Sequence, residues 1–415
     1  MIQRLLKRRD VRKFLGNKLA VFSLVLVGIY VVTAVLVSGF GFVPREDCFK
    51  IVGPKSSAPE FAGEPNAEER VRRAEFYVNR VQKGLEQHEK WRKRQRQKSG
   101  SPTAEQEQAS LDTLLDDIAL GEMRVVNKPA DELQDSLDEA WDIYDELESN
   151  VITDTPETLA QVDKLQTISD GLFQPLSGRS AFRRRIETFL GTDNQGRSIF
   201  LRALYSIGVA MKVGVVVGLI SVIIGSILGG AAGYFGGFVD TIITWIFTTF
   251  SSIPSLVLLV LLAYMFTGSR FEGTLVPLYI AFIATYWIGP CRQIRGETLK
   301  IKQLEYVHAA QALGLNRFTI LVKHILPNAV HLMLINFSLL FIGAIKGEVI
   351  LTYLGLGLKP GAGTSWGIMI SQARPEVIQG FFWQIGTATF LMFVLVLAFN
   401  ILSDALQDAF DPKSL

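Results

Sequence analysis

The sequence predicts an all-α integral membrane protein with six transmembrane helices and a helical insert outside the membrane. Apolar residues make up 49% and charged residues 20% of the 415 positions, and the apolar residues are strongly clustered. A helix needs about 20 apolar residues to cross the hydrocarbon layer of a bilayer. Six stretches reach or approach that length: 19–37, 211–233, 241–266, 275–291, 329–353 and 381–402.

The first crossing, residues 19–37, is predicted to be a retained anchor. Its apolar run is longer than the roughly 7–15 residues of a signal-peptide core, and no small-residue cleavage site follows it.

Basic residues indicate the orientation of the chain in the membrane. The tail before residue 19 carries seven Lys and Arg residues against the single acid Asp10, and the loop 292–323 is also basic. The positive-inside rule places both segments in the cytoplasm. Six crossings then return the carboxyl terminus to the cytoplasmic side.

Residues 46–188 are predicted to form a charged extracytoplasmic insert, which separates the tail and anchor (1–45) from a five-helix core (189–415). Apolar residues recur at helical spacing in a basic half and again in an acidic half of the insert. They are Val71, Ala74, Val78, Val81 and Leu85, then Leu133, Leu137, Ala140, Tyr144 and Leu147. Two amphipathic helices of opposite charge could pair as an antiparallel hairpin. A partly disordered charged insert is the alternative.

In the core, glycines predict where two helices pack closely, and prolines predict where a helix bends. Five glycines of the second crossing, at 214, 218, 225, 229 and 233, share one helix face and allow a neighbouring helix to approach closely. Pro254 removes a backbone hydrogen bond in the third crossing, so a kink is expected there. The fourth crossing, 275–291, is the shortest and has Pro277 near its start.

The basic loop 292–327 contains the most informative motif, Glu-Tyr-Val-His-Ala-Ala-Gln-Ala-Leu-Gly at 305–314. It predicts a short cytoplasmic helix. Glu305 suits the positive end of the helix dipole, and the small Ala309 and Ala310 would let the helix press into a groove of a partner. Gly314 can supply the left-handed residue with which helices often end.

Two residues after this motif have simpler expected roles. Pro327 fits the first turn of the next transmembrane helix, where its missing N–H is not needed. His324 is expected to pack against or cap a helix end rather than to act as a ligand or base.

The motif resembles the EAA loop of binding-protein-dependent ABC importer permeases, in which Glu-Ala-Ala is followed after three residues by Gly. His308 stands here in place of the usual acid. In that family the loop is a coupling helix that docks into a cleft of the ATPase subunit. The resemblance therefore implies an ATPase-coupling role for Glu305, Ala309, Ala310, Gly314, His324 and Pro327.

Further motifs resemble those of the dipeptide and oligopeptide permeases within this family. Residues that match the family signatures are Gly191, Thr192, Asp193, Gly196 and Arg197 before the second crossing, then Asn400, Asp404 and Asp411-Pro412 at the end. Ser198 and Ser403 depart from the usual pattern. The resemblance is strong over 189–415 and weak over 1–45, and it implies an importer-permease (MetI-like) core. The insert has no counterpart in ordinary members.

Two ionisable residues, Lys346 and Glu348, fall within the fifth crossing. Charged groups at this depth should face the bundle interior or water rather than lipid. A separation of two residues points them to different helix faces. Glu348 faces either the translocation path or a partner permease, or it is an interfacial group that reaches water, and the sequence leaves these alternatives open.

No catalytic machinery is visible in the sequence. A phosphate-binding Gly-x-x-x-x-Gly-Lys-Ser/Thr motif and a metal-ligand spacing of histidines are both missing. The chain is therefore expected to be a non-catalytic subunit that binds no cofactor or metal, with ATP and Mg²⁺ held by partner subunits. An integral membrane enzyme would need a clustered catalytic set.

The resemblance implies a permease subunit that imports peptides or peptide-like solutes across the bacterial cytoplasmic (inner) membrane. Its implied partners are a second permease, two ABC ATPases, an extracytoplasmic substrate-binding protein and the lipid bilayer, without nucleic acid. Two alternatives stay open. The solute could be a nickel complex, a cell-wall fragment or a sugar, or the insert could dock an envelope partner with transport as a secondary role.

Overall fold

The computed structural model describes residues 16–63, 65–99, 102–121, 123–149 and 155–410. The basic residues before position 16 and the Asp411-Pro412 motif lie outside this range. Within it, helices are joined by turns and four isolated bridges, without a strand. The all-α class is confirmed. The chain divides into two compact units, Met1–Arg45 with Arg202–Gln372 and Ala388–Leu415, and Glu46–Leu201 with Ala373–Thr387.

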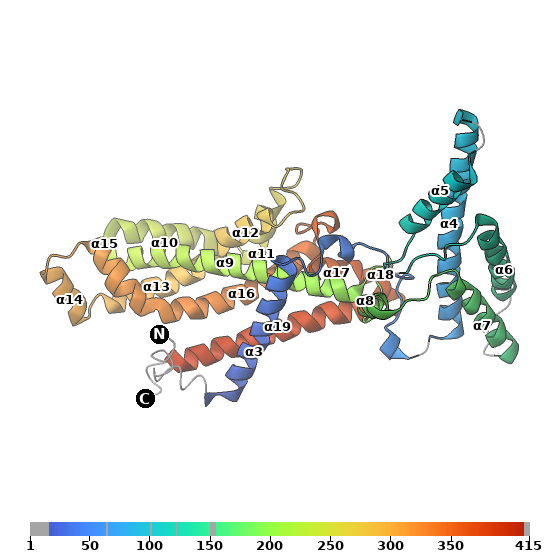
Figure 1. Ribbon diagram of the computed structural model, residues 1–415. Coiled ribbons are helices and arrows are strands. Elements are labelled where there is room, and N and C mark those ends of the chain that lie inside the picture. Colours follow the sequence, from blue (N-terminus) through green and yellow to red (C-terminus); the bar gives the residue numbers. More distant parts are fainter. Residues whose placement is uncertain (1–15, 64, 100–101, 122, 150–154, 411–415) are drawn as a thin grey trace. The chain divides into compact units, whose positions relative to one another are not determined.

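The first unit is a bundle of apolar helices (Figure 1). Its elements are α3 (Lys18–Ser38), α9 (Ile199–Phe235), α10 (Gly237–Ser251), α11 (Ser255–Tyr264), α12 (Val276–Tyr286), α13 (Ile288–Ile301), α14 (Glu305–Ala312), α15 (Arg317–Ile320), α16 (Val330–Tyr353), α17 (Trp366–Gln372) and α19 (Trp383–Phe410). The first residues of α9 and α19 belong to the second unit. Among the described residues, four helical spans are long and apolar enough to cross a membrane, and α10 with α11 makes a fifth if the bent pair is one span.

The expected fourth crossing, 275–291, is built from two shorter helices. It covers α12 and only the first residues of α13, with Trp287 between them. Neither helix reaches the length of a single membrane span. The crossing expected at 275–291 therefore stays a prediction. Four of the six expected segments meet the length and composition that a crossing requires, and 241–266 makes a fifth if the bent pair of α10 and α11 is one span.

The kink expected at Pro254 is confirmed. Helix α10 ends at Ser251, α11 begins at Ser255, and their axes differ by 87°. Pro254 lacks the N–H that would continue the helical ladder, and its own backbone is extended, with ψ of 127°. The helical path therefore breaks sharply between α10 and α11 rather than bending gently.

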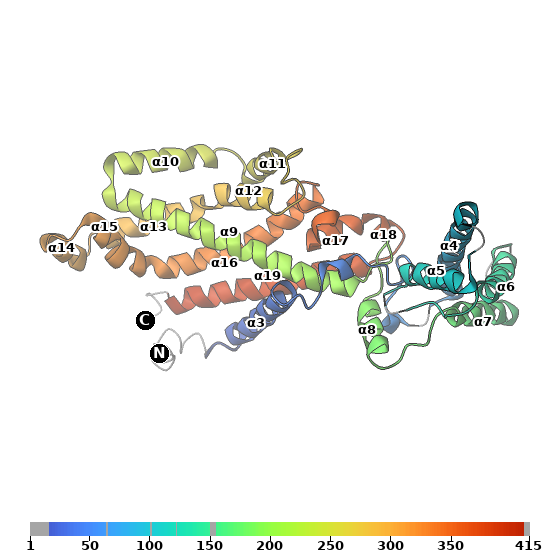
Figure 2. The same cartoon turned by 45° about the horizontal axis from the view of Figure 1, so that its top comes forward.

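The glycine face of α9 is the contact surface for two other helices, as its spacing predicts. A Cβ on Gly214 would lie 2.5 Å from the Phe341 ring of α16, and one on Gly229 would lie 2.3 Å from the carbonyl oxygen of Cys291 in α13. Figure 2 shows α9, α13 and α16 running side by side. Only hydrogen at these positions lets the backbones come so close.

The anchor helix α3 packs onto the same bundle. The Asn17 side chain caps it by accepting from the backbone N–H groups of Leu19 and Ala20 at 3.0 and 3.3 Å. Further along, the Tyr30 hydroxyl donates to the Leu391 carbonyl oxygen at 2.9 Å. This hydrogen bond fixes α3 against α19, so the anchor is part of the helical packing and does more than tether the chain.

The second unit contains the charged insert, which folds around a core of its own. Its helices are α4 (Ala67–Ser99), α5 (Ala104–Asp117), α6 (Ala130–Ser149), α7 (Pro156–Gly171), α8 (Gly178–Thr188) and the short α18 (Arg374–Ile378). Both predicted apolar stripes, on α4 and α6, are buried in one hydrophobic cluster. The cluster also takes Leu111 and Leu115 from α5 and Val162 and Leu165 from α7.

The insert is thus a four-helix arrangement where the sequence predicts a two-helix hairpin. The reason is geometric, because two stripes facing only each other would leave their edges open to water. The α4–α7 contact is the most extensive of the unit, and it includes a hydrogen bond of 2.7 Å from Arg70 to Gln166. The shorter apolar patterns of α5 and α7 complete the burial.

Candidate coupling surface and signature loop

Helix α14 occupies the bounds that its motif predicts. It begins at Glu305 and ends at Ala312, and Gly314 has φ of +74°. The Gly314 N–H donates to Gln311 O at 3.0 Å and the Leu315 N–H donates to Ala310 O at 3.2 Å. This pair of bonds is the Schellman arrangement, in which the left-handed residue is nearly always glycine.

The two alanines of the motif have opposite environments. Ala310 is 5% exposed and belongs to a hydrophobic cluster with Val307 of the same helix and Ile294 and Ile320 of α13 and α15. Ala309, by contrast, faces out and is exposed. Of this adjacent pair, Ala309 is therefore the one available to a partner, as is the exposed Ala312, and the small size of Ala310 serves the packing of α14 onto its own chain. This corrects the expectation that both alanines face a partner groove.

The outer side of α14 and the segment after it expose large apolar side chains. Leu313 is 81% exposed and Phe318 is 64% exposed. Three others are 41–47% exposed: Leu304, Tyr306 and Leu315. A contiguous group of this kind on a polar loop is typical of a protein interaction surface. We refer to Leu304, Tyr306, Ala309, Leu313, Leu315 and Phe318 as the α14 surface.

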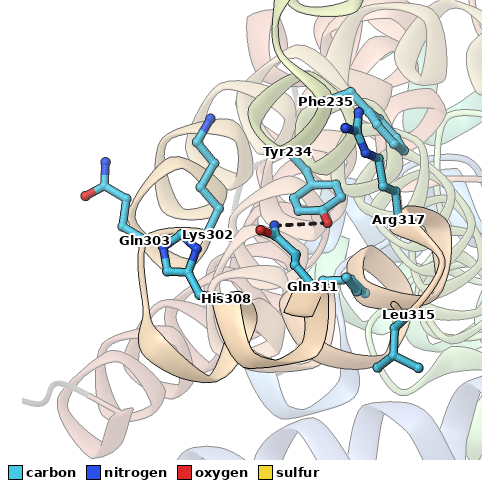
Figure 3. A pocket seen from close by; sticks show the side chains of 9 residues that line it. Tyr234, Phe235, Lys302, Gln303, His308, Gln311, Leu315 and Arg317 are labelled. Atoms are coloured by element: carbon cyan, nitrogen blue, oxygen red, sulfur yellow. Dashed lines mark hydrogen bonds between the residues drawn. The ribbon is translucent and has the colours of Figure 1, made fainter. Parts of the chain in front are cut away.

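A cavity of about 540 Å³ lies beside this surface (Figure 3). Its lining residues are Tyr234, Phe235, Lys302, Gln303, His308, Gln311, Leu315, Arg317 and Ile320. Gln311 donates to the Tyr234 hydroxyl at 3.4 Å, and Lys302 donates to Gly233 O at 3.0 Å. Both bonds connect the α14 region to the end of α9. The lining includes two cationic side chains, Lys302 and Arg317, and no acid.

His324 and Pro327 lie in an irregular helical stretch rather than at a clean helix start. Residues 321–325 form a π-helical turn and 326–329 a 3₁₀ turn directly before α16. The span 317–353 is therefore nearly continuous, and it begins well before the expected residue 329. Pro327 cannot supply the usual backbone donor inside such a run, and local π and 3₁₀ turns absorb that defect. His324 O accepts from Asn328 Nδ2 at 2.6 Å.

The signature residues at 191–197 form a closed loop in the second unit. Asp193 is fully buried, and its Oδ2 accepts from Arg197 Nε at 2.8 Å and Nη2 at 2.7 Å. Its Oδ1 accepts from the backbone N–H groups of Gln195 and Arg197, both at 2.9 Å. Gly191 and Gly196 have φ of +76° and +77°. The arrangement is a structural clamp, because both charges are paired and satisfied inside the chain.

Comparison with known proteins finds a family match in the carboxyl-terminal half of the chain. The family described as binding-protein-dependent transport system inner membrane component matches residues 221–415. The dipeptide transport system permease protein DppC of Bacillus subtilis is 36% identical over 226 residues, which cover 54% of this chain and 68% of DppC. The chain belongs to this permease family. It is an inner membrane transport component with several apolar helices.

Other relatives have the same level of similarity to this permease. The oligopeptide permease OppC of Bacillus subtilis is 35% identical and the glutathione permease GsiD of Pectobacterium atrosepticum is 36% identical, each over 54% of this chain and 72% of the relative. Among solved structures, a chain of the MetNI methionine ABC transporter in an inward-facing conformation matches with 16% identity and a TM-score of 0.42. That match covers 51% of this chain and 98% of the other.

The two ionisable residues of α16 point to different faces of the permease, as their spacing predicts. Lys346 is exposed, and Glu348 is 2% exposed. Thr352 Oγ1 donates to Glu348 Oε1 at 2.9 Å. The buried carboxyl group of Glu348 therefore has a hydrogen-bond donor from its own helix, one turn further along. A role in the translocation path stays a prediction.

The last signature residues are not brought to the coupling surface. Asn400 and Asp404 are both exposed and lie one turn apart on one face of α19.

The sequence-based prediction missed the residues that make the α14 surface apolar, above all Leu313 and Phe318. A signal for them existed, because leucines on both sides of a helix-ending glycine are unusual in a loop that is meant to face water.

Proposed function

We propose that this chain is the transmembrane permease subunit of an ATP-driven importer of peptides or peptide-like solutes. The relatives named for dipeptide, oligopeptide and glutathione transport support this solute class. ATP and Mg²⁺ would be bound by two partner ATPases, and a second permease and an extracytoplasmic binding protein would complete the transporter. The amino terminus and the loop that carries α14 would lie in the cytoplasm because their segments are basic, and six crossings would return the carboxyl terminus to the same side.

The observation that carries the proposal is the α14 surface. The capped end of a short helix exposes Leu313, and the following segment exposes Phe318, next to a cavity whose lining includes two cationic side chains. An ATPase cleft that received this helix would bury apolar area and could place acidic side chains near Lys302 and Arg317. Such a combination gives both affinity and a defined register.

The packing inside the chain explains how motion of an ATPase would reach the membrane helices. Val307 and Ala310 of α14 are buried against Ile294 of α13 and against Ile320 and Ile325, which lead into α16. A close-packed cluster cannot be compressed, so displacement of α14 must shift its neighbours. Nucleotide binding would then bias the bundle between two packed arrangements.

Substitution of Leu313 by Asp tests the docking role. The side chain is 81% exposed, so the change removes apolar contact area without opening a cavity in this chain. We expect co-purification with the ATPases and coupled peptide uptake to be lost, while membrane insertion and the melting temperature of the isolated subunit stay unchanged. Leu313→Met, which keeps the apolar contact, is the matched control. Wild-type association in Leu313→Asp would contradict the proposal.

The solute class is tested separately in proteoliposomes that hold the complete transporter. We expect saturable ATP-dependent uptake of labelled di- or oligopeptides that unlabelled peptides compete away. Uptake of a nickel complex, a cell-wall fragment or a sugar, with no effect of peptides, would overturn the peptide assignment and leave the permease assignment intact.

A further inference from the structure

A second cavity lies within the second unit, away from the α14 surface. It has a volume of about 210 Å³. Its lining residues are Gly53, Pro54, Ser57, Ala58, Arg73, Tyr77, Met123, Arg184, Thr188, Gly191 and Thr192. It is therefore shared by the segment 53–58, helix α4 of the insert, helix α8 and the signature loop, which lie far apart in the sequence.

One wall of this cavity is held rigidly. The Thr192 N–H donates to Ser57 O, and the Ser57 N–H donates to Thr192 Oγ1, both at 3.0 Å. The backbones meet closely, because a Cβ on Gly191 would lie only 2.1 Å from Ser57 O. Ser56 has φ of +50°, the only positive value of a non-glycine residue in the described range. A strained segment that is fixed on both sides is typical of a functional site.

The opposite side brings two guanidinium groups to the cavity. Arg184 Nη1 donates to the carbonyl oxygens of Val52 and Leu120, which fixes its position. Arg73 Nη2 pairs with Glu69 at 2.7 Å. The Arg73 Nε is buried and has no hydrogen-bond partner in the described structure. A buried donor without a partner is costly, and in native proteins it usually has a functional explanation.

We propose that this cavity binds a small oxyanion, either a carboxylate or a phosphate group, between Arg73 and Arg184. The planar guanidinium fork matches both groups, and no acidic side chain lines the cavity. Pockets for drug-sized ligands usually start at about 300 Å³, so the ligand has at most the size of an amino acid. The ligand supplies the acceptor that Arg73 Nε lacks.

Occupancy of the site would join the insert to the signature loop. Arg73 lies on α4, whereas Arg184 lies on α8, close to Gly191 and Thr192. An anion that bridges the two arginines therefore ties the first helix of the insert to the family-specific part of the unit. The inference does not depend on the solute or on the ATPase partners.

Isothermal titration of the full chain in detergent, at constant ionic strength, tests the proposal. Inorganic phosphate and acetate are the two anionic probes, and acetamide is the neutral probe. We expect saturable binding of at least one anion and none of acetamide. The anion that binds more tightly identifies the ligand group as a carboxylate or a phosphate. Arg73→Gln should weaken binding about tenfold or more, the usual effect of losing a charged hydrogen-bond donor. Lys83→Gln, an exposed change of equal charge on the same helix, should leave it unchanged.

A second variant separates loss of the site from loss of folding. Ala58→Leu keeps every charge and fills the cavity, so it should also abolish binding, while the far-ultraviolet circular dichroism matches that of the wild type. The proposal is overturned if neither anion binds saturably, or if Arg73→Gln or Ala58→Leu binds as the wild type does.

Discussion

At the scale of single residues, neighbouring positions of α14 have opposite surroundings. Ala309 is exposed and Ala310 is 5% exposed within a cluster of eight buried apolar residues. A helix turns by about 100° per residue, so adjacent alanines in one motif can serve different contacts. The motif therefore combines an exposed position, for which we propose docking, and a packing position.

Substitution of each alanine by glutamate separates the two roles. Ala310→Glu would bury an unpaired charge and should destabilise the isolated subunit by at least about 2 kcal/mol. Ala309→Glu should change stability by less than about 0.5 kcal/mol and instead weaken association with the ATPase. Denaturant unfolding and co-purification measure the two effects. Equal loss of stability in both variants would refute the assignment.

The glycines of α9 give a second residue-scale prediction. Gly229→Ala places a methyl group against the Cys291 carbonyl, a backbone atom that cannot turn away, so we expect a loss of about 1–3 kcal/mol. Gly296 of α13 has no atom within 4 Å of its added Cβ. Gly296→Ala should therefore be neutral or stabilising by up to about 1 kcal/mol. Thermal unfolding in detergent distinguishes them, and equal melting temperatures would show that the seam is not tightly packed.

At the scale of elements, a side-chain contact joins two connections between helices of the bundle. The loop between α11 and α12 is closed by Glu272, which accepts from Lys359 Nζ and from the Gly268 N–H. The hydrogen bond from Lys359 is the main cause that lowers the pKa of Glu272, with the Gly268 bond second. This contact joins the loop to the segment after α16 and so holds two connections of the bundle together.

Acidification should release this contact. Because the pKa of Glu272 is lowered in the folded chain, its contribution is present above the ordinary carboxyl pKa and is lost as the pH falls through the lowered value. The effect is small, since the pair is exposed. The protection factors of residues 266–274 against hydrogen exchange, which correct for the pH dependence of intrinsic exchange, should fall on acidification in the wild type. In Glu272→Gln the protection factors should be low at every pH, and a pH-dependent fall in that variant would contradict the prediction.

At the scale of the whole molecule, the two units have separate hydrophobic cores. The insert core takes its residues from α4 to α7 and the adjoining segments, whereas the membrane helices contribute to other clusters. Arg70 near the start of α4 hydrogen-bonds Gln166 near the end of α7, so the two ends of the four-helix insert lie close together. Because these two ends are close, we expect that a short linker could replace the insert.

Replacement of residues 67–171 by a short Gly-Ser linker should therefore leave membrane insertion and ATPase association intact. Membrane fractionation and co-purification measure the outcome, with Leu313→Asp as the control for lost association. Uptake in the same variant tells whether the insert takes part in transport or has a separate envelope role. Failure of the shortened chain to insert would show that the insert is required for folding of the bundle.

Features that depend on local chemistry could be predicted from the amino-acid sequence alone. Long apolar runs identify membrane helices, a left-handed residue requires Gly314, Pro254 must break a helix, and period-four glycines must share one face. The apolar stripes of the insert are periodic in the same way, so their burial could also be predicted. Each of these follows from backbone geometry within a few residues.

Features that depend on contacts between distant segments became visible in the three-dimensional structure. It placed Ala310 inside and Ala309 outside, added α5 and α7 to the insert core, and made α12 and α13 two short helices where one crossing was expected. It also brought Arg73 and Arg184, 111 positions apart in the sequence, to one cavity. Periodicity defines which face of a helix is apolar, whereas the identity of its partner is set by packing that no local pattern encodes.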